Sequence, residues 1–180
     1  MMSMIRKFFS SLFCSLALFT AGAAAQDQAG SAADKDKLVV TADDTLEWHR
    51  DKKRFYARGA AVAERGTSSI HGDTLIAHYN DNGDGDMRIT KLIAEESVRI
   101  ISDDSTAHGV RAVYDVNERR AVMTGNNLRL VMPDQTVFAE ERFIYNVAAG
   151  QFTARGNARV EREDTKLRAD ELVAELVPID

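Results

Sequence analysis

An aromatic residue closes the same short phrase four times along the chain, and successive copies lie 31, 35 and 31 residues apart. A repeat of this length is typical of proteins in which one supersecondary unit stacks on the next. Each unit is too small to bury its apolar face alone, so the units must share one continuous core. The four phrases are TADDTLEW ending at Trp48, HGDTLIAHY ending at Tyr79, AHGVRAVY ending at Tyr114 and FAEERFIY ending at Tyr145.

Glycine is a second marker in the same register. It falls 11 residues after the aromatic in three of the units, at Gly59, Gly125 and Gly156. Within a strand a glycine marks a bulge or sharp bend, so its repetition predicts that every hairpin curves the same way. The second unit lacks this glycine and carries the insert NDNGDGD after Tyr79, which explains its longer step. A fifth copy of the phrase, RADELVAEL, has Glu175 at the aromatic position.

Within each unit the alternation has a period of two, as expected for strands with one buried face. Leu75, Ala77 and Tyr79, for example, alternate with Ile76 and His78. No stretch is a convincing amphipathic helix. We therefore predict an all-β fold, a curved β-jellyroll or open sandwich of repeated hairpins, with no significant helix apart from a signal peptide. Beyond each glycine the alternation does not settle which residues face inward.

The first 25 residues have the order of a secretory signal peptide. Arg6 and Lys7 precede an apolar run, and Ala23 and Ala25 form an A-x-A pair before the cleavage point. A retained membrane anchor is the alternative, but serine and threonine interrupt a run shorter than the ~20 residues that a spanning helix needs. We expect export to the periplasm, with residues 1–25 cleaved, 26–37 a flexible leader, 38–177 the folded domain and 178–180 a short tail.

Charge and composition exclude several classes of function. Without residues 1–25 the chain has 21 basic and 28 acidic residues, a formal charge of −7, so nucleic acid is a poor partner. The single cysteine, Cys14, lies within the signal peptide, which leaves no disulfide or thiolate site afterwards. No catalytic motif is present and the four histidines lack ligand spacing. We expect no enzyme, no cofactor and no metal; the NDNGDGD insert is either a long hairpin turn or a degenerate calcium loop.

Aromatic residues alternate with alanines at the inward positions of the predicted strands, as in Phe55 and Ala57 or Phe152 and Ala154. Two interpretations stay open. Large and small side chains can interlock in an ordinary close-packed core. Alternatively, the alanines can leave parts of the interior underfilled and able to accept an acyl chain.

Both ends of the predicted domain are apolar strands without the charges that usually protect a sheet edge. Two unlike edges that pair with one another propagate head to tail, so this pattern indicates a chain of subunits. The predicted self-association edges comprise Leu38, Val39 and Val40 at one end, and Leu172, Val173 and Leu176 at the other.

Taken in order, the phrases LVVTADDTLEW, RGAAV, HGDTLIAHY, TGNNL, RGNARV and RADELV resemble the OstA/LptA family of periplasmic lipopolysaccharide-transport proteins. The resemblance covers about Leu38 to Val177. It implies a β-jellyroll whose hydrophobic groove holds the acyl chains of lipid A and continues from subunit to subunit. The groove residues are then Leu46, Trp48, Phe55, Leu75, Tyr79, Val110, Tyr114, Met123, Phe143, Tyr145 and Phe152.

The resemblance also implies partners. These are lipopolysaccharide, further copies of the chain joined head to tail, and the jellyroll domains of LptC-like inner-membrane and LptD-like outer-membrane proteins, in a pathway that assembles the outer membrane of Gram-negative bacteria. Two alternatives remain: the LptC-like subunit of the same pathway, or a structural β-repeat protein with no lipid ligand. A periplasmic hydrolase is the weakest hypothesis because no acid/base set is found.

Overall fold

The computed structural model describes residues 38–81, 87–102, 104–146 and 148–175. The signal peptide, the leader, most of the NDNGDGD insert, Leu176 and the predicted tail lie outside these residues. The described part forms twelve antiparallel strands and no helix. It therefore contains no helix that could cross a membrane. The strands are β1 Val39–Thr41, β2 Thr45–His49, β3 Arg54–Arg65, β4 Ser68–Asp81, β5 Met87–Ser102, β6 Ser105–Asp115, β7 Arg120–Thr124, β8 Leu128–Met132, β9 Gln135–Ala139, β10 Arg142–Asn146, β11 Gln151–Arg162 and β12 Lys166–Glu175.

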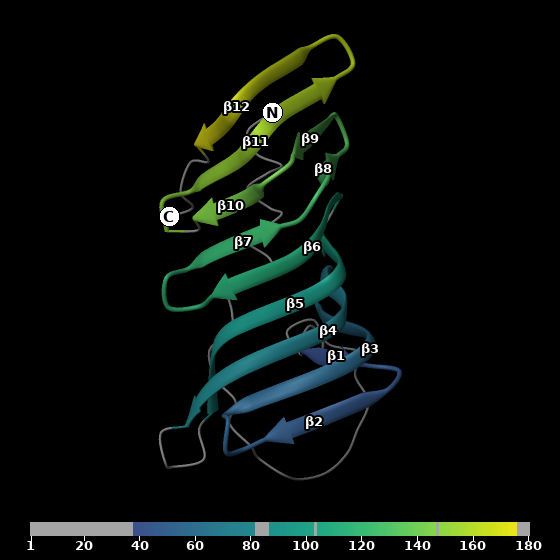
Figure 1. Cartoon of the computed structure of the whole chain (residues 1–180), viewed down its shortest axis with the longest axis vertical. Helices are drawn as coiled ribbons and strands as arrows, with labels where there is room; N and C mark the ends of the chain where they lie inside the picture. The colour runs from purple at the N-terminus through teal and green to yellow at the C-terminus, as the bar shows by residue number, and fades with distance from the viewer. Residues whose placement is uncertain (1–37, 82–86, 103, 147, 176–180) are drawn as a thin grey trace, which may run out of the picture.

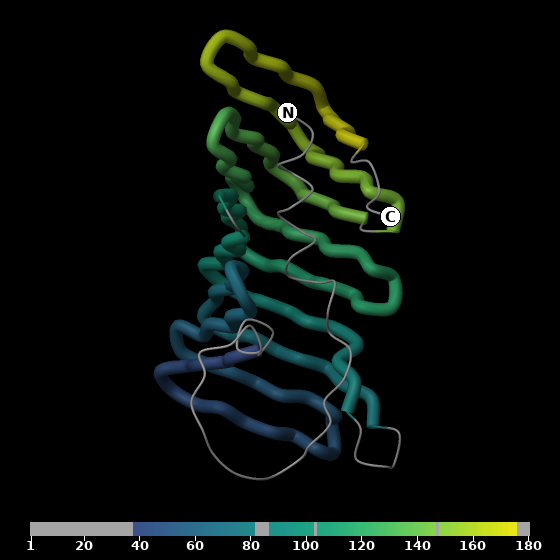
Figure 2. Tube along the Cα trace, turned by 180° about the vertical axis from the view of Figure 1, so that it is seen from behind, coloured from purple at the N-terminus to yellow at the C-terminus, as the bar shows by residue number. Residues whose placement is uncertain are grey.

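Each repeated phrase forms the first strand of a hairpin. The phrases that end at Trp48, Tyr79, Tyr114 and Tyr145 form β2, β4, β6 and β10, which pair with β3, β5, β7 and β11. RADELVAEL forms β12, which pairs back onto β11. The hairpins stack along the long axis of the molecule from β2 to β12 (Figures 1 and 2). The prediction of an all-β chain of repeated hairpins is confirmed.

The sheet bends at one place along every hairpin, which divides it into two layers. The register shifts between Arg58 and Ala61 in β3, between Glu95 and Val98 in β5, and between Arg155 and Ala158 in β11. Layer 1 is the side that contains β2, β7 and β10, and layer 2 is the side that contains β1, β8 and β9. The long strands β3, β4, β5, β6, β11 and β12 run through both layers.

Glycine makes two of these bends for the same reason. Gly59 and Gly156 have φ values of 81° and 85°, a region that other residues avoid. A Cβ atom at Gly59 would lie 2.5 Å from a side-chain atom of Asp44 in the neighbouring segment. A Cβ atom at Gly156 would lie equally close to Glu141. The backbone N–H of the preceding residue, Asp43 or Glu140, donates to the glycine carbonyl at 2.7 Å and 2.8 Å. The corner needs glycine because the two backbones cross this closely.

The second unit bends although it lacks the glycine that the other units share. Glu96 and Ser97 take left-handed backbone conformations there, with φ values of 61° and 51°. They interrupt the pairing of β5 with β6 between Glu95 and Val98. A strained pair of ordinary residues thus replaces the glycine, and the bend persists at the strand that follows the insert.

The closely packed core lies towards the C-terminal end of the stack. It joins Met123, Phe143 and Phe152 of layer 1 to residues of layer 2 that face them, and every one of its members is less than a tenth exposed. The layer 2 members with the largest apolar side chains are Ile70, Val98, Ile100, Leu128, Leu130, Met132 and Val137.

Candidate functional site

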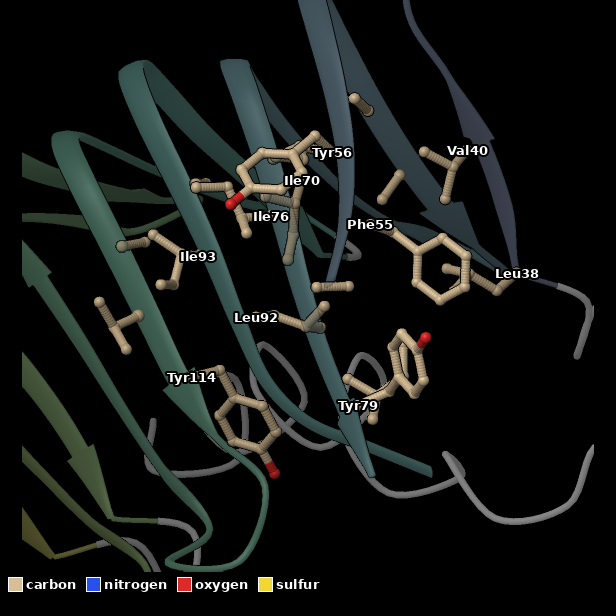
Figure 3. A pocket seen from close by; sticks show the side chains of 18 of the residues that line it. Leu38, Val40, Phe55, Tyr56, Ile70, Ile76, Tyr79, Leu92, Ile93 and Tyr114 are labelled. Carbon is tan, nitrogen blue, oxygen red and sulfur yellow. The ribbon is translucent and has the colours of Figure 1, made fainter. Parts of the chain in front are cut away.

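A cavity of about 660 Å³ lies between the layers at the N-terminal end of the stack (Figure 3). Strands β1 to β7 supply its walls. Glu47 and Arg65 are the charged members of a lining that is otherwise aromatic, aliphatic or alanine. Such a space can take up apolar matter and offers few groups for polar chemistry.

Aromatic rings form one wall at the mouth of the cavity. The ring centroids of Trp48 and Phe55 lie 5.4 Å apart, and those of Phe55 and Tyr79 lie 5.1 Å apart. The indole N–H of Trp48 donates to the hydroxyl oxygen of Tyr79 at 2.8 Å, which fixes the orientation of the indole. Trp48 is nevertheless 45% exposed and Leu46 is 64% exposed. The wall is therefore rigid but open to solvent at this end.

The cavity exists because several strand positions behind this wall are alanines, whose side chains are single methyl groups. Across the strands, Phe55 is in register with Ala77, and Tyr114 is in register with Ala121. Ala77 and Ala121 line the cavity, as do Ala57, Ala94 and Ala112 of the neighbouring row. In layer 2 the facing positions include Ala63, which is also small. Space remains because the alanines of layer 1 do not reach the layer 2 wall, which also contains Val40, Ile70 and Ile100.

The same alternation fills the interior at the C-terminal end. Met123, Phe143, Tyr145 and Phe152 are between 3% and 6% exposed, and the rings of Phe143 and Phe152 lie 5.4 Å apart. A gap of about 20 Å³ remains among them, which is room for about one water molecule. Close packing of large against small side chains thus describes this half of the molecule, and the underfilled interior is found in the other half.

Six of the predicted groove residues line the cavity and five do not. Leu46, Trp48, Phe55, Leu75, Tyr79 and Tyr114 line it. Met123, Phe143, Tyr145 and Phe152 lie in the packed half instead. Val110 is 50% exposed and lines neither space, because it sits where β6 passes through the bend and the alternation changes phase. The described structure does not show one groove that runs the whole length of the chain.

Layer 2 supplies cavity residues that the sequence analysis missed. Ile70 of β4 and Ile100 of β5 are opposite one another and face the cavity. Alternation along the sequence does not assign the phase of these segments, because each bend adds residues to the strand. Counting the alternation afresh from Ala61, which is fully buried, would have placed Ala63 inward as well.

Of the predicted edge residues, Leu38 and Val40 also line the cavity, and Val39 and Val173 are 44% and 52% exposed. Leu172 is partly buried against the core. In the described residues β1 and β2 pair with β3 alone and β12 pairs with β11 alone, so these strands end the stack.

Glu47, one of the two charged residues of the lining, forms ordinary surface ion pairs. Glu47 accepts hydrogen bonds from His49 at 2.6 Å and from Arg58 at 3.1 Å, and these contacts lower the pKa of the Glu47 carboxyl. Within the described residues no group of three histidine, cysteine or acidic side chains could hold a metal ion. The geometry is that of an apolar cavity.

The sequence profile of the LptA/(LptD N-terminal domain) LPS transport protein family matches residues 39–150. This chain belongs to that family. The match confirms the resemblance found in the sequence, and membership of this family of lipopolysaccharide transport proteins confirms the expectation of a protein that is not an enzyme. Among curated protein sequences no match is found.

A solved structure supports the fold of this family member. The chain resembles LptH of Pseudomonas aeruginosa, described as the LptA homologous periplasmic component of the conserved lipopolysaccharide transport device. The TM-score is 0.51 at 18% sequence identity, and the likeness covers 63% of this chain and 78% of LptH. At this identity the comparison bears on the fold, and it confirms the predicted open β architecture.

Proposed function

We propose that this family member carries lipopolysaccharide through the periplasm by sheltering acyl chains of lipid A in the cavity between its layers. The observation that carries the proposal is the cavity itself, about 660 Å³ of largely apolar space with a solvent-open aromatic mouth. A protein of this transport family with a packed interior would have no such place for a hydrocarbon chain. The proposed site comprises Leu46, Trp48, Phe55, Leu75, Tyr79 and Tyr114, joined by Ile70, Leu92 and Ile100.

Burial of methylene groups supplies the binding energy. Each CH₂ removed from water contributes ~0.8 kcal/mol, so a segment of about ten methylenes gains on the order of 8 kcal/mol before ordering costs. Two cations border this space, which suits the anionic phosphates of lipid A. Arg65 lines the cavity, and the guanidinium carbon of Arg50 lies 4.0 Å from the centroid of the Trp48 ring.

The proposal includes the domain limits and the location expected from the sequence. Residues 1–25 act as a cleaved signal peptide, and residues 38–177 form the working domain after a leader. A protein recovered from the periplasm with Gln26 as its first residue would carry the mark of this processing.

Fluorescence of Trp48 tests the lipid proposal directly, because it is the only tryptophan of the chain and it lies at the cavity mouth. We expect that titration with purified lipid A shifts the Trp48 emission to shorter wavelength and increases it, since acyl chains replace water around the indole. The curve should saturate. A purely structural β-repeat protein would show no saturable shift, and neither should this chain when it is titrated with the deacylated sugar.

We also propose that copies join head to tail, with β12 of one copy beside β1 and β2 of the next. These terminal strands are unlike, carry exposed apolar side chains such as Val39 and Val173, and present free edges within the described residues. Unlike edges that pair propagate rather than close. Edge-exposing jellyroll domains of LptC-like and LptD-like proteins would fit the two ends of such a bridge.

Sedimentation velocity tests this assembly. We expect Val173→Lys to lower the weight-average size at high concentration, because a lysine on an edge strand disfavours pairing with another chain. Thr153→Lys is the matched control, since Thr153 lies in register with Val173 on β11, one strand away from the edge. A chain that stays monomeric at every concentration, or equal behaviour of the two variants, would contradict head-to-tail pairing through β12.

A further inference from the structure

A row of basic side chains crosses the outer face of layer 2. His71 of β4, Arg99 of β5, His108 of β6 and Arg129 of β8 are successive partners in the strand register. Neighbouring strands lie about 4.8 Å apart, so these four side chains form a continuous basic row. Arg99 and Arg129 are exposed, and the two imidazoles are partly buried between them.

Three members of this basic row line a hollow of about 420 Å³ beside the bend. His71, Arg99 and His108 share the hollow with Ser97, and Asp73 supplies a carboxylate at its rim. The hollow opens away from the lipid cavity. Ile70 and Ile100, the sequence neighbours of His71 and Arg99, face that cavity, and successive side chains of a strand point to opposite faces.

Arginines on the outer face of layer 1 have carboxylate partners. The Nε atom of Arg58 lies 3.1 Å from Glu47, and that of Arg111 lies 3.2 Å from Glu95. Arg155 lies between Glu141 and Glu171 at 3.8 Å and 3.7 Å. In the described part of the chain no such ion pair is found for Arg99 or Arg129 of the basic row.

Burial is the main influence on the pKa values of the two histidines, and the neighbouring arginines add to it. Burial and then the Arg99 guanidinium lower the pKa of His71, whereas Glu64 raises it. Burial, Arg129 and Arg99 lower the pKa of His108. The Nη2 atom of Arg99 lies 3.4 Å from Nδ1 of His71, whose Nε2 lies 3.0 Å from the Ser69 hydroxyl. If Arg99 donates to Nδ1, His71 is neutral with its proton on Nε2, and an anion near Nδ1 would favour a second proton there.

We propose that His71, Arg99 and His108 form a phosphate-binding site on the outer face of layer 2. The planar guanidinium of Arg99 lies between the two imidazoles and donates paired N–H groups to phosphate oxygens. The protonated imidazoles add a donor from each side. The ligand is inorganic phosphate or a phosphate ester. It is distinct from lipid in the cavity of the same copy, which lies on the other face of the sheet.

Nuclear magnetic resonance of the imidazole C–H groups tests this site with inorganic phosphate as the probe. We expect saturable shifts at His71 and His108 and a rise in the pKa of both imidazoles, because the bound anion stabilises their charged forms. His49 lies on layer 1 beside Glu47 and serves as the internal control, whose signals should not move. Arg99→Gln should abolish the shifts, and the matched variant Arg58→Gln should retain them.

Two further arms identify the ligand and its charge dependence. With sulfate, whose charge is constant near neutral pH, affinity should fall as the pH rises through the imidazole pKa values, and His108→Gln should weaken that dependence. At least tenfold tighter binding of glucosamine phosphate than of inorganic phosphate would identify a phosphosugar, and equal affinity would identify free phosphate. Shifts that do not saturate, that occur equally at His49, or that survive in Arg99→Gln would overturn the site.

Discussion

Ala77→Phe should abolish most lipid A binding while leaving the fold intact. Ala77 lies on the cavity wall in register with Phe55 and Leu92, and a phenyl ring there would occupy the space that we assign to an acyl chain. We expect the dissociation constant to rise at least tenfold, equivalent to about 1.4 kcal/mol. Trp48 remains the only tryptophan, so its emission measures binding to the variant and to the parent in the same way.

Thr74→Phe is the matched control for this substitution. Thr74 lies on the same strand three residues earlier, and it is in register with Arg58 and Glu95, which belong to the outer face. The added ring is the same but lies outside the cavity, so binding should be unchanged. If Ala77→Phe binds lipid A as tightly as Thr74→Phe, the cavity is not the acyl site.

Phe152→Ala should cost about 3–5 kcal/mol of unfolding free energy, the usual penalty for removing a fully buried phenyl ring. Phe152 is 3% exposed and packs against Phe143 in the half of the molecule that has almost no free volume. The loss leaves a void that close-packed neighbours cannot collapse into. Equilibrium unfolding in urea measures the change.

Phe55 provides the comparison, because it occupies the same repeat position 97 residues earlier. It is only partly buried and already borders empty space, so Phe55→Ala removes fewer contacts and should cost markedly less. Equal losses for the two variants would mean that the halves are equally packed in solution, against the division that the structure shows.

The sequence predicted the strands, the hairpins and the bends because these depend on local patterns. Alternation placed Trp48 and Tyr145 on inward faces, and the glycine spacing placed the corners at Gly59 and Gly156. The sequence could not show which half of the interior is hollow and which is filled, because that depends on the side chains of the other layer. Leu128, Leu130 and Val137 fill the space opposite Phe143, whereas Ala63, Ile70 and Ile100 of layer 2 leave a cavity open at the N-terminal end.

The same dependence on distant residues explains Val110 and the basic row. Val110 shares its parity with Ala112 and Tyr114, but a bend between Val98 and Glu95 on the paired strand takes it out of phase. His71, Arg99, His108 and Arg129 are separated by 28, 9 and 21 residues, spacings in which no motif is visible. Only the pairing register brings them into one row.

Equivalent repeat positions are packed loosely at the N-terminal end of the stack and closely at the C-terminal end, so the two ends should differ in flexibility. Local opening is cheapest where few apolar contacts must be broken, so amide hydrogens of β2 to β4 should exchange through small fluctuations and those of β10 and β11 mainly through global unfolding. Under the proposed function, the end that would receive a lipid chain can then widen to fit chains of different length, while the other end keeps the two layers in place. Flexibility at one end and rigidity at the other follow from a single repeat whose interior is underfilled at the N-terminal end and closely packed at the C-terminal end.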